Sequence, residues 1–175
     1  MVADLGFGGG VGLGLLLEAT GPDGRVHGLE LSEDMITGAG RRYRVMVLSG
    51  RLVLHRVRGA SFPLPDSSLD ALITVNTFYF VAELGPLLGE VARVLRPGAR
   101  LVVGVGDPIR MARMPVTRHG FRLRPVDVLI EALQAAGLPM VEHRRVGQGD
   151  DAAHVLVAQR QPLGLDQASE SDLAS

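Results

Sequence analysis

The sequence Asp4-Leu5-Gly6-Phe7-Gly8-Gly9-Gly10 stands between a short apolar start and the leucine-rich segment 11–19. Glycines at alternate positions remove Cβ from a tight turn, which lets the backbone lie directly against a ligand. The segment 11–19 is typical of a helix, and the free amides at a helix N-terminus favour polar or anionic groups. This stretch therefore predicts a strand, a bare loop and a helix that together bind a ligand.

Apolar strands and amphipathic helices alternate along the rest of the chain, which predicts βαβ units and a parallel sheet. Ser32 is expected to cap one helix, and Gly137 to end another. After the strand that opens the chain, further strands are predicted at residues 25–30, 52–57, 69–75, 101–105, 140–146 and 154–159. After the helix expected over the segment 11–19, further helices are predicted at residues 32–47, 84–95 and 125–136. The last two strands have no helix between them, so one strand is expected to be antiparallel. The predicted fold class is α/β, a Rossmann-like seven-stranded, mostly parallel sheet with helices on both faces.

Composition bounds the class of protein. The 175 residues suit one domain, with a core expected at residues 1–160 and a flexible tail at 161–175. The chain has no cysteine, and all its 18 basic residues are arginine, which excludes thiolate metal sites, a cysteine nucleophile and lysine Schiff-base chemistry. A net charge of −1 gives no support to binding of nucleic acid or a membrane surface. A cytoplasmic protein is expected, and its oligomeric state stays open.

Glu30 lies 20 residues after Gly10, at the end of the second predicted strand. In open α/β sheets ligands bind at the carboxyl ends of the strands, and a carboxylate placed there can accept hydrogen bonds from both ribose hydroxyls. The loop and Glu30 together predict a cofactor that contains a nucleoside. The dinucleotide spacing G-x-G-x-x-G is absent, because it would need glycine at Val11 or Leu13.

The pattern D-x-G-x-G-x-G at residues 4–10 resembles the first motif of class I S-adenosylmethionine-dependent methyltransferases. Further segments resemble later motifs of that family, in the same order and over about residues 1 to 160: Gly28-Leu29-Glu30-Leu31-Ser32, the stretch 62–70 around Pro65-Asp66, and Arg93-Val94-Leu95-Arg96-Pro97-Gly98. Residues 76–80 and 117–121 look like the branch that methylates small molecules.

The resemblance implies a cofactor and a set of site residues. S-adenosylmethionine would be the cofactor, and the reaction would be in-line methyl transfer to a small-molecule acceptor. No metal is implied. His119 is the candidate general base for a hydroxyl or amine acceptor. By the resemblance, the methionine half of the cofactor would contact Asp4, Gly6, Phe7, Gly8 and Gly10. The ribose would contact Glu30, and the adenine would contact Leu31 and the backbone of Arg58 and Gly59. Asn76 and Thr77 would lie near the reacting end of the cofactor.

The sequence departs from this family in two places. Arg58 stands where the family often has an acidic residue that contacts the adenine amino group. The chain also begins almost on its first strand, so the helices that usually precede that strand and cover the cofactor are expected to be missing. Two other classes of function therefore stay open: a cofactor-binding or partner module with weak or no catalysis, and a nicotinamide-dependent oxidoreductase on a related sheet.

Overall fold

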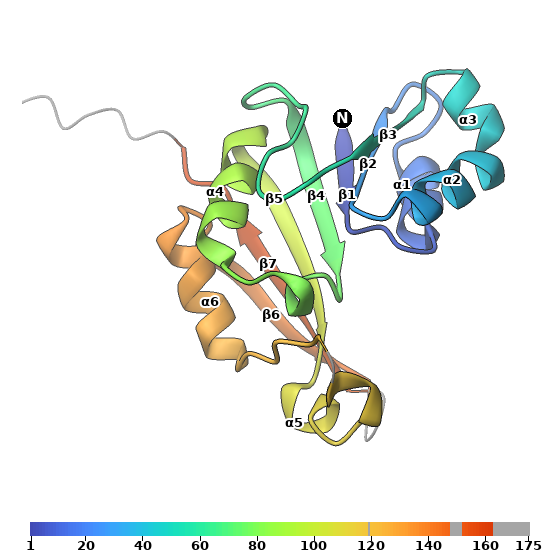
Figure 1. The fold of residues 1–175 in the computed structure, drawn as a ribbon. Coiled ribbons are helices and arrows are strands. Elements are labelled where there is room, and N and C mark those ends of the chain that lie inside the picture. The colour runs from blue at the N-terminus through green and yellow to red at the C-terminus, as the bar shows by residue number, and fades with distance from the viewer. Residues whose placement is uncertain (119, 148–151, 163–175) are drawn as a thin grey trace, which may run out of the picture.

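A computed structural model describes residues 1–118, 120–147 and 152–162, which form a seven-stranded sheet with helices on both faces (Figure 1). The strand order is β3-β2-β1-β4-β5-β7-β6. Strand β7 is antiparallel to β5 and β6, whereas neighbours among β1 to β5 are parallel, so the predicted fold class is confirmed. The strands are β1 (Val2–Leu5), β2 (Val26–Glu30), β3 (Leu52–Arg56), β4 (Leu69–Val75), β5 (Leu95–Gly106), β6 (Met140–Val146) and β7 (Ala153–Gln159).

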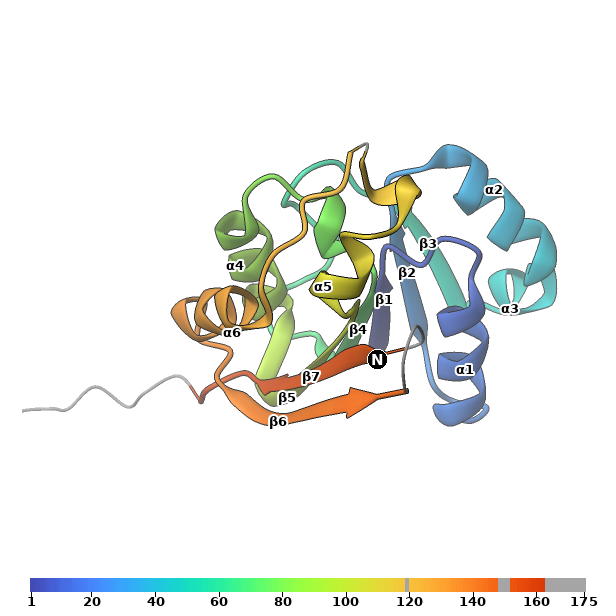
Figure 2. The same cartoon turned by 90° about the horizontal axis from the view of Figure 1, so that it is seen from below.

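The helices divide between the two halves of the sheet (Figure 2). One group lies beside β1, β2 and β3, and the other contacts β5 and β6 through α4 and α6. The first group is α1 (Val11–Ala19), α2 (Glu33–Arg42) and α3 (Arg44–Leu48), and the second is α4 (Leu84–Val94), α5 (Pro108–Met111) and α6 (Val126–Ala135). Within the described ranges, no helix has both the length and the apolar character that a bilayer crossing requires.

Side chains of successive strand residues point to opposite faces, and each face has its own core. The larger core joins Leu72 of β4 to Leu88 of α4 and Leu133 of α6. The smaller core joins Val26 of β2 to Leu13 of α1. The sheet is therefore anchored on both sides, and its carboxyl edge stays free to carry loops.

The predicted helix 84–95 is observed as α4, which ends at Val94, and its buried residues recur at helical spacing: Leu84, Leu87, Leu88, Val91 and Val94. The following strand begins earlier than predicted, because β5 already includes Leu95 and continues through Pro97 and Gly98. Its pairing with β4 shifts register between Leu69 and Ala71. A proline lacks the amide that a ladder needs, so such an irregularity is expected there.

The helix predicted over residues 32–47 is interrupted. Its start is confirmed, because the Ser32 hydroxyl accepts a hydrogen bond from the Met35 amide at 3.4 Å. The helix then breaks at Tyr43, whose backbone angles of −107° and 29° lie outside the helical region. The hydroxyl of Tyr43 donates to the Gly10 carbonyl at 2.8 Å, which ties this break to the glycine loop.

Arg93 joins two of the segments that the sequence singled out. Its guanidinium donates to the carbonyls of Phe62 and Leu64 at 3.3 and 3.0 Å, and it forms ion pairs with Asp66 and Glu90. The crossover from β3 to β4 is therefore fixed against the end of α4.

Candidate cofactor site

The carboxyl ends of β1, β2, β3 and β4 lie at the same edge of the sheet, and a pocket of about 950 Å³ opens there. Pockets of this size are large enough for a drug-sized ligand. Most of its lining residues are apolar. The lining residues that the sequence predicted are Gly6, Gly8, Glu30, Leu31, Gly59, Asn76 and Thr77.

The glycine loop crosses the end of β4 at very close range. Gly6 has a φ of 70°, and its amide donates to the Leu29 carbonyl at 2.7 Å. A Cβ at this position would lie 2.3 Å from the hydroxyl oxygen of Thr77. That hydroxyl donates to the Leu5 carbonyl at 3.1 Å, so the ends of β1 and β4 are joined directly. Only glycine fits here without movement of the loop.

Glu30 links the loop after β1 to the loop after β2. One carboxylate oxygen accepts from the Gly8 amide at 3.0 Å, and the other accepts from the amides of Leu31 and Ser32 at 2.8 and 3.0 Å. Glu30 and Gly8 both line the pocket. Each carboxylate oxygen has two acceptor sites, so one site remains for a hydroxyl donor of a ligand, on the oxygen that meets the Gly8 amide.

Asn76 lies at the end of β4 in a left-handed conformation, with a φ of 56°. The backbone amide of Asn76 donates to the Gly104 carbonyl at 2.8 Å, which holds the turn against β5. Asparagine tolerates this conformation better than most residues. The turn exposes Asn76 to the pocket, next to Thr77.

Asp4 lies beneath the loop and not in the lining of the pocket. Its side chain is buried, and burial raises the pKa of its carboxyl to about 7, with a smaller contribution from the negative charge of Glu30. The carboxylate faces the first turn of α1, because a Cβ on Gly12 would lie 2.2 Å from its Oδ2 atom. A carboxyl with this pKa changes charge near neutral pH.

The structure places the other predicted residues away from the pocket lining. Phe7 is buried in the smaller core, where its ring fills the space that a Cβ on Gly28 would need. Gly10 caps α1 with a φ of 79°. Arg58 is exposed beside the site. His119, the candidate base, lies outside the described residues, as does the predicted tail from residue 163.

Sequence reasoning missed Gly12, which lies against the buried Asp4, and a group of residues that line the pocket. Gly12 continues the alternate glycine spacing of the loop by one more step, so the pattern itself contained the signal. The group that lines the pocket lies after Thr77 and after the end of β3, with Met35 of α2 in addition, and no spacing in the sequence marked it. Its members line the pocket: Met35, Val57, Ala60, Phe80, Val81, Ala82, Glu83, Pro86 and Leu87.

Replacing Gly12 with Ala is expected to lower the free energy of unfolding by about 1 to 3 kcal/mol, because the added methyl overlaps the Asp4 carboxylate. Gly89→Ala is the matched control, since Gly89 is also helical and its Cβ would meet open space. That control should gain up to about 1 kcal/mol from helix propensity. Urea denaturation of both variants measures the difference, and an equal response would contradict the close contact.

The fold and the carboxylate beside bare backbone at this edge of the sheet are those of an α/β domain suited to a nucleoside cofactor. The family description of a methyltransferase domain matches residues 3–103, which include the glycine loop, Glu30 and Asn76. The chain therefore belongs to the class I S-adenosylmethionine-dependent methyltransferases, and the resemblance seen in the sequence is confirmed.

Solved structures show the same fold. An S-adenosylmethionine-dependent methyltransferase from Aquifex aeolicus superposes with a TM-score of 0.78 at 23% identity, over 91% of this chain and 81% of that chain. One from Mesorhizobium loti gives 0.75 at 20% identity, over 91% of this chain and 90% of that chain. At this level of identity the likeness concerns the fold.

Two curated relatives have a higher sequence identity to this chain, over a smaller part of it. An uncharacterized protein of transposon TN4556 in Streptomyces fradiae is 39% identical over 59% of this chain and 29% of its own length. The 27-O-demethylrifamycin SV methyltransferase of Amycolatopsis mediterranei is 30% identical over 57% of this chain and 37% of its own length. The chain thus spans less than half of these two relatives.

Proposed function

We propose that this chain transfers a methyl group from S-adenosylmethionine to a small-molecule acceptor. The observation that carries the proposal is the meeting of the Glu30 carboxylate with the Gly8 amide in the lining of a large pocket at the carboxyl edge of the sheet. A carboxylate beside bare backbone at this edge suits a nucleoside ribose.

The pocket fits this cofactor in shape and in charge. Gly8 lines it, and a Cβ there would stand in open space that a ligand can use. The charged side chains among its described lining residues are Glu30 and Glu83, both acidic. When bound, the cofactor supplies a methyl group on a positively charged sulfonium, which acidic surroundings favour.

The chain's own contribution is positioning and the exclusion of water. Glu30 and the glycine loop hold the nucleoside side, and Asn76 and Thr77 lie where β4 ends. With the cofactor held by Glu30 and the glycine loop, the pocket would align the acceptor with the methyl group that S-adenosylmethionine would supply, and S-adenosylhomocysteine would be the leaving group. The acceptor's proton, where it has one to lose, passes to solvent or to a base.

The lining also indicates what kind of acceptor fits. Part of the pocket wall is apolar, and the charged residues in the lining are acidic. The apolar part is formed by Val75, Phe80, Val81, Pro86 and Leu87. We therefore propose an acceptor with an apolar body and no net negative charge. The named relative that acts on a rifamycin derivative supports an acceptor of small-molecule size.

Binding of S-adenosylhomocysteine, followed by calorimetry and thermal unfolding, tests the cofactor part of the proposal. At a ligand concentration 100 times the dissociation constant, the fold should gain about 2.7 kcal/mol. Methyl transfer from labelled S-adenosylmethionine to a panel of neutral and anionic small molecules tests the activity. Binding without transfer to any acceptor would favour the cofactor-binding module, and binding of NADH instead would favour the oxidoreductase.

A further inference from the structure

The part of the pocket wall that follows β4 is held from outside by residues 120–124. The wall is formed by η1 (Phe78–Phe80) and the residues after it, and Phe80, Val81 and Ala82 line the pocket. Few backbone hydrogen bonds fix this segment internally: the Phe80 amide donates to Thr77 at 3.0 Å, and the Val81 amide donates to Phe78 at 3.4 Å. Its position therefore depends on contacts with other segments.

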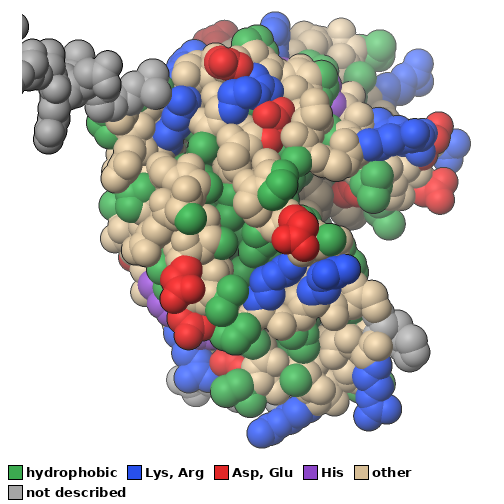
Figure 3. All heavy atoms as spheres, turned by 60° about the vertical axis from the view of Figure 1, so that its left-hand side comes forward, with side chains coloured by type: hydrophobic (Ala, Val, Ile, Leu, Met, Phe, Trp, Pro, Cys, Tyr) green, Lys and Arg blue, Asp and Glu red, His purple; other side chains and the backbone are tan. Residues whose placement is uncertain are grey.

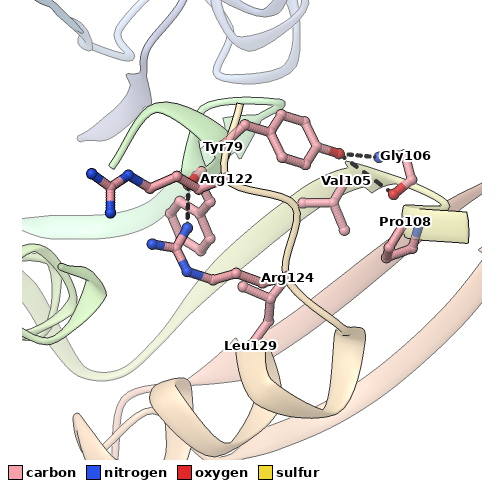
Figure 4. Close-up of a pocket in the computed structure, with 8 residues that line it drawn as sticks. Tyr79, Val105, Gly106, Pro108, Arg122, Arg124 and Leu129 are labelled. Atoms are coloured by element: carbon pink, nitrogen blue, oxygen red, sulfur yellow. Dashed lines mark hydrogen bonds between the residues drawn. The ribbon is translucent and has the colours of Figure 1, made fainter. Parts of the chain in front are cut away.

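Arg124 makes the most extensive of these contacts. One end of its guanidinium donates to the Phe78 carbonyl at 2.9 Å, and the other donates to the carbonyls of Val81 and Ala82 at 2.6 and 2.8 Å. Figure 4 shows the guanidinium directed at this segment, above Leu129. One side chain thus satisfies three carbonyls across the whole length of the wall.

Two neighbouring contacts support the same segment. The Arg122 amide donates to the Tyr79 carbonyl at 2.8 Å, and the Phe121 ring packs edge-on against Phe80 with centroids 4.8 Å apart. On the far side, the buried Tyr79 hydroxyl accepts from the Gly106 amide at 2.6 Å (Figure 4). The wall is therefore fixed between the end of β5 and the segment before α6.

We propose that Arg124 is a positioning residue, which sets the pocket wall formed by residues 78–82 for binding of the cofactor and its acceptor. This inference rests on the proposed function, because it assigns the wall to that pocket. Arginine suits the role, since its planar fork presents several donors in fixed directions and stays charged. A lysine ammonium is a single point of contact and cannot serve three separated carbonyls equally well.

The other arginines of this region have a different environment. Arg113, Arg118 and Arg122 are exposed, and Figure 3 shows basic side chains spread over the surface, some of them at the lower end of the molecule, where α5 lies in Figure 1. The guanidinium of Arg124 instead turns inward to the backbone of the wall.

Hydrogen exchange and ligand binding together test the proposal on the whole chain. In Arg124→Met, the amides of Phe80 and Val81 should exchange faster than in the wild type, with no ligand present. If the wall is then correctly placed in about one molecule in ten, the affinity for S-adenosylhomocysteine should fall about tenfold. In Arg124→Lys, both the exchange rates of these amides and the affinity for S-adenosylhomocysteine should lie between those of the wild type and those of Arg124→Met.

Arg51→Met is the matched control. Arg51 also donates to backbone carbonyls, those of Leu17 at 2.9 Å and of Gly21, but it lies at the amino edge of the sheet, away from the pocket. This variant should lose stability, yet keep slow exchange at Phe80 and Val81 and keep its affinity for S-adenosylhomocysteine. A simple loss of stability would affect both variants alike, whereas positioning affects Arg124→Met alone.

Unchanged exchange at Phe80 and Val81 in Arg124→Met would overturn the proposal, as would unchanged affinity in a variant whose wall exchanges faster. Failure of the proposed function has a separate signature. In that case the wild type does not bind S-adenosylhomocysteine at all, and exchange without ligand still decides whether Arg124 holds the wall.

Discussion

Replacing Glu30 with Gln is expected to weaken the binding of S-adenosylhomocysteine about ten- to a hundredfold, since the hydrogen bond from a ribose hydroxyl to this charged acceptor contributes about 1.5 to 3 kcal/mol. The carboxylate already accepts from three backbone amides, of Gly8, Leu31 and Ser32. An amide group in its place presents NH₂ either to the Gly8 amide or to the other two. Both the charge and part of the loop connection are therefore lost.

Titration calorimetry of the wild type and Glu30→Gln measures this effect. A 2′-deoxy analogue of S-adenosylhomocysteine makes this test more specific. If Glu30 binds the 2′-hydroxyl, the losses of binding free energy caused by the variant and by the analogue should not be additive. Glu33→Gln is the control: its ion pair with Arg56 is exposed, and its loss should leave affinity unchanged. Equal affinity of Glu30→Gln and the wild type would remove the basis for the nucleoside site.

Features set by short-range chemistry were predictable from the sequence. The cap at Ser32, the apolar face of α4 and the succession of strands along the chain follow from periodicity and from turn residues that act on near neighbours. The positions of Gly6 and Glu30 at one edge followed because the carboxyl ends of parallel strands meet there. Local patterning therefore located the pocket, although the roles of its residues stay predictions.

The remaining features depend on contacts between segments far apart in the chain. Arg124 binds the Phe78 carbonyl across 46 residues, and no spacing in the sequence marks such a pair. Phe7 shows that a local pattern can also suggest a contact that the fold does not make. Its place in a glycine loop suggested a ligand contact, whereas packing against Gly28 turns its ring into the core. Which face a loop side chain takes is decided by the space that tertiary packing leaves.

Replacing Asp4 with Asn is expected to stabilise the unliganded protein at pH 8, by up to roughly 4 kcal/mol. Burial, and secondarily the charge of Glu30, raises the pKa of this carboxyl from 3.8 to about 7 in the folded state. Between these two values the folded state holds a proton that the unfolded state has released, so stability falls as the pH rises. Below pH 3.8 both states are protonated, and above pH 7 the full cost of the buried charge is present.

Urea denaturation of the wild type and Asp4→Asn across pH 4 to 8 measures this dependence. The difference in stability should be small at pH 4 and grow up to about pH 7. Comparison of the two proteins removes the opposite slope of His27, whose pKa is lowered to about 4 chiefly by burial. Glu90→Gln provides a control of opposite sign, because hydrogen bonds from Arg93 hold the pKa of Glu90 below its usual value and its contribution is lost in acid. Parallel profiles for the wild type and Asp4→Asn would show that Asp4 is ionised at no cost, and the fold would then have to supply a partner for its charge.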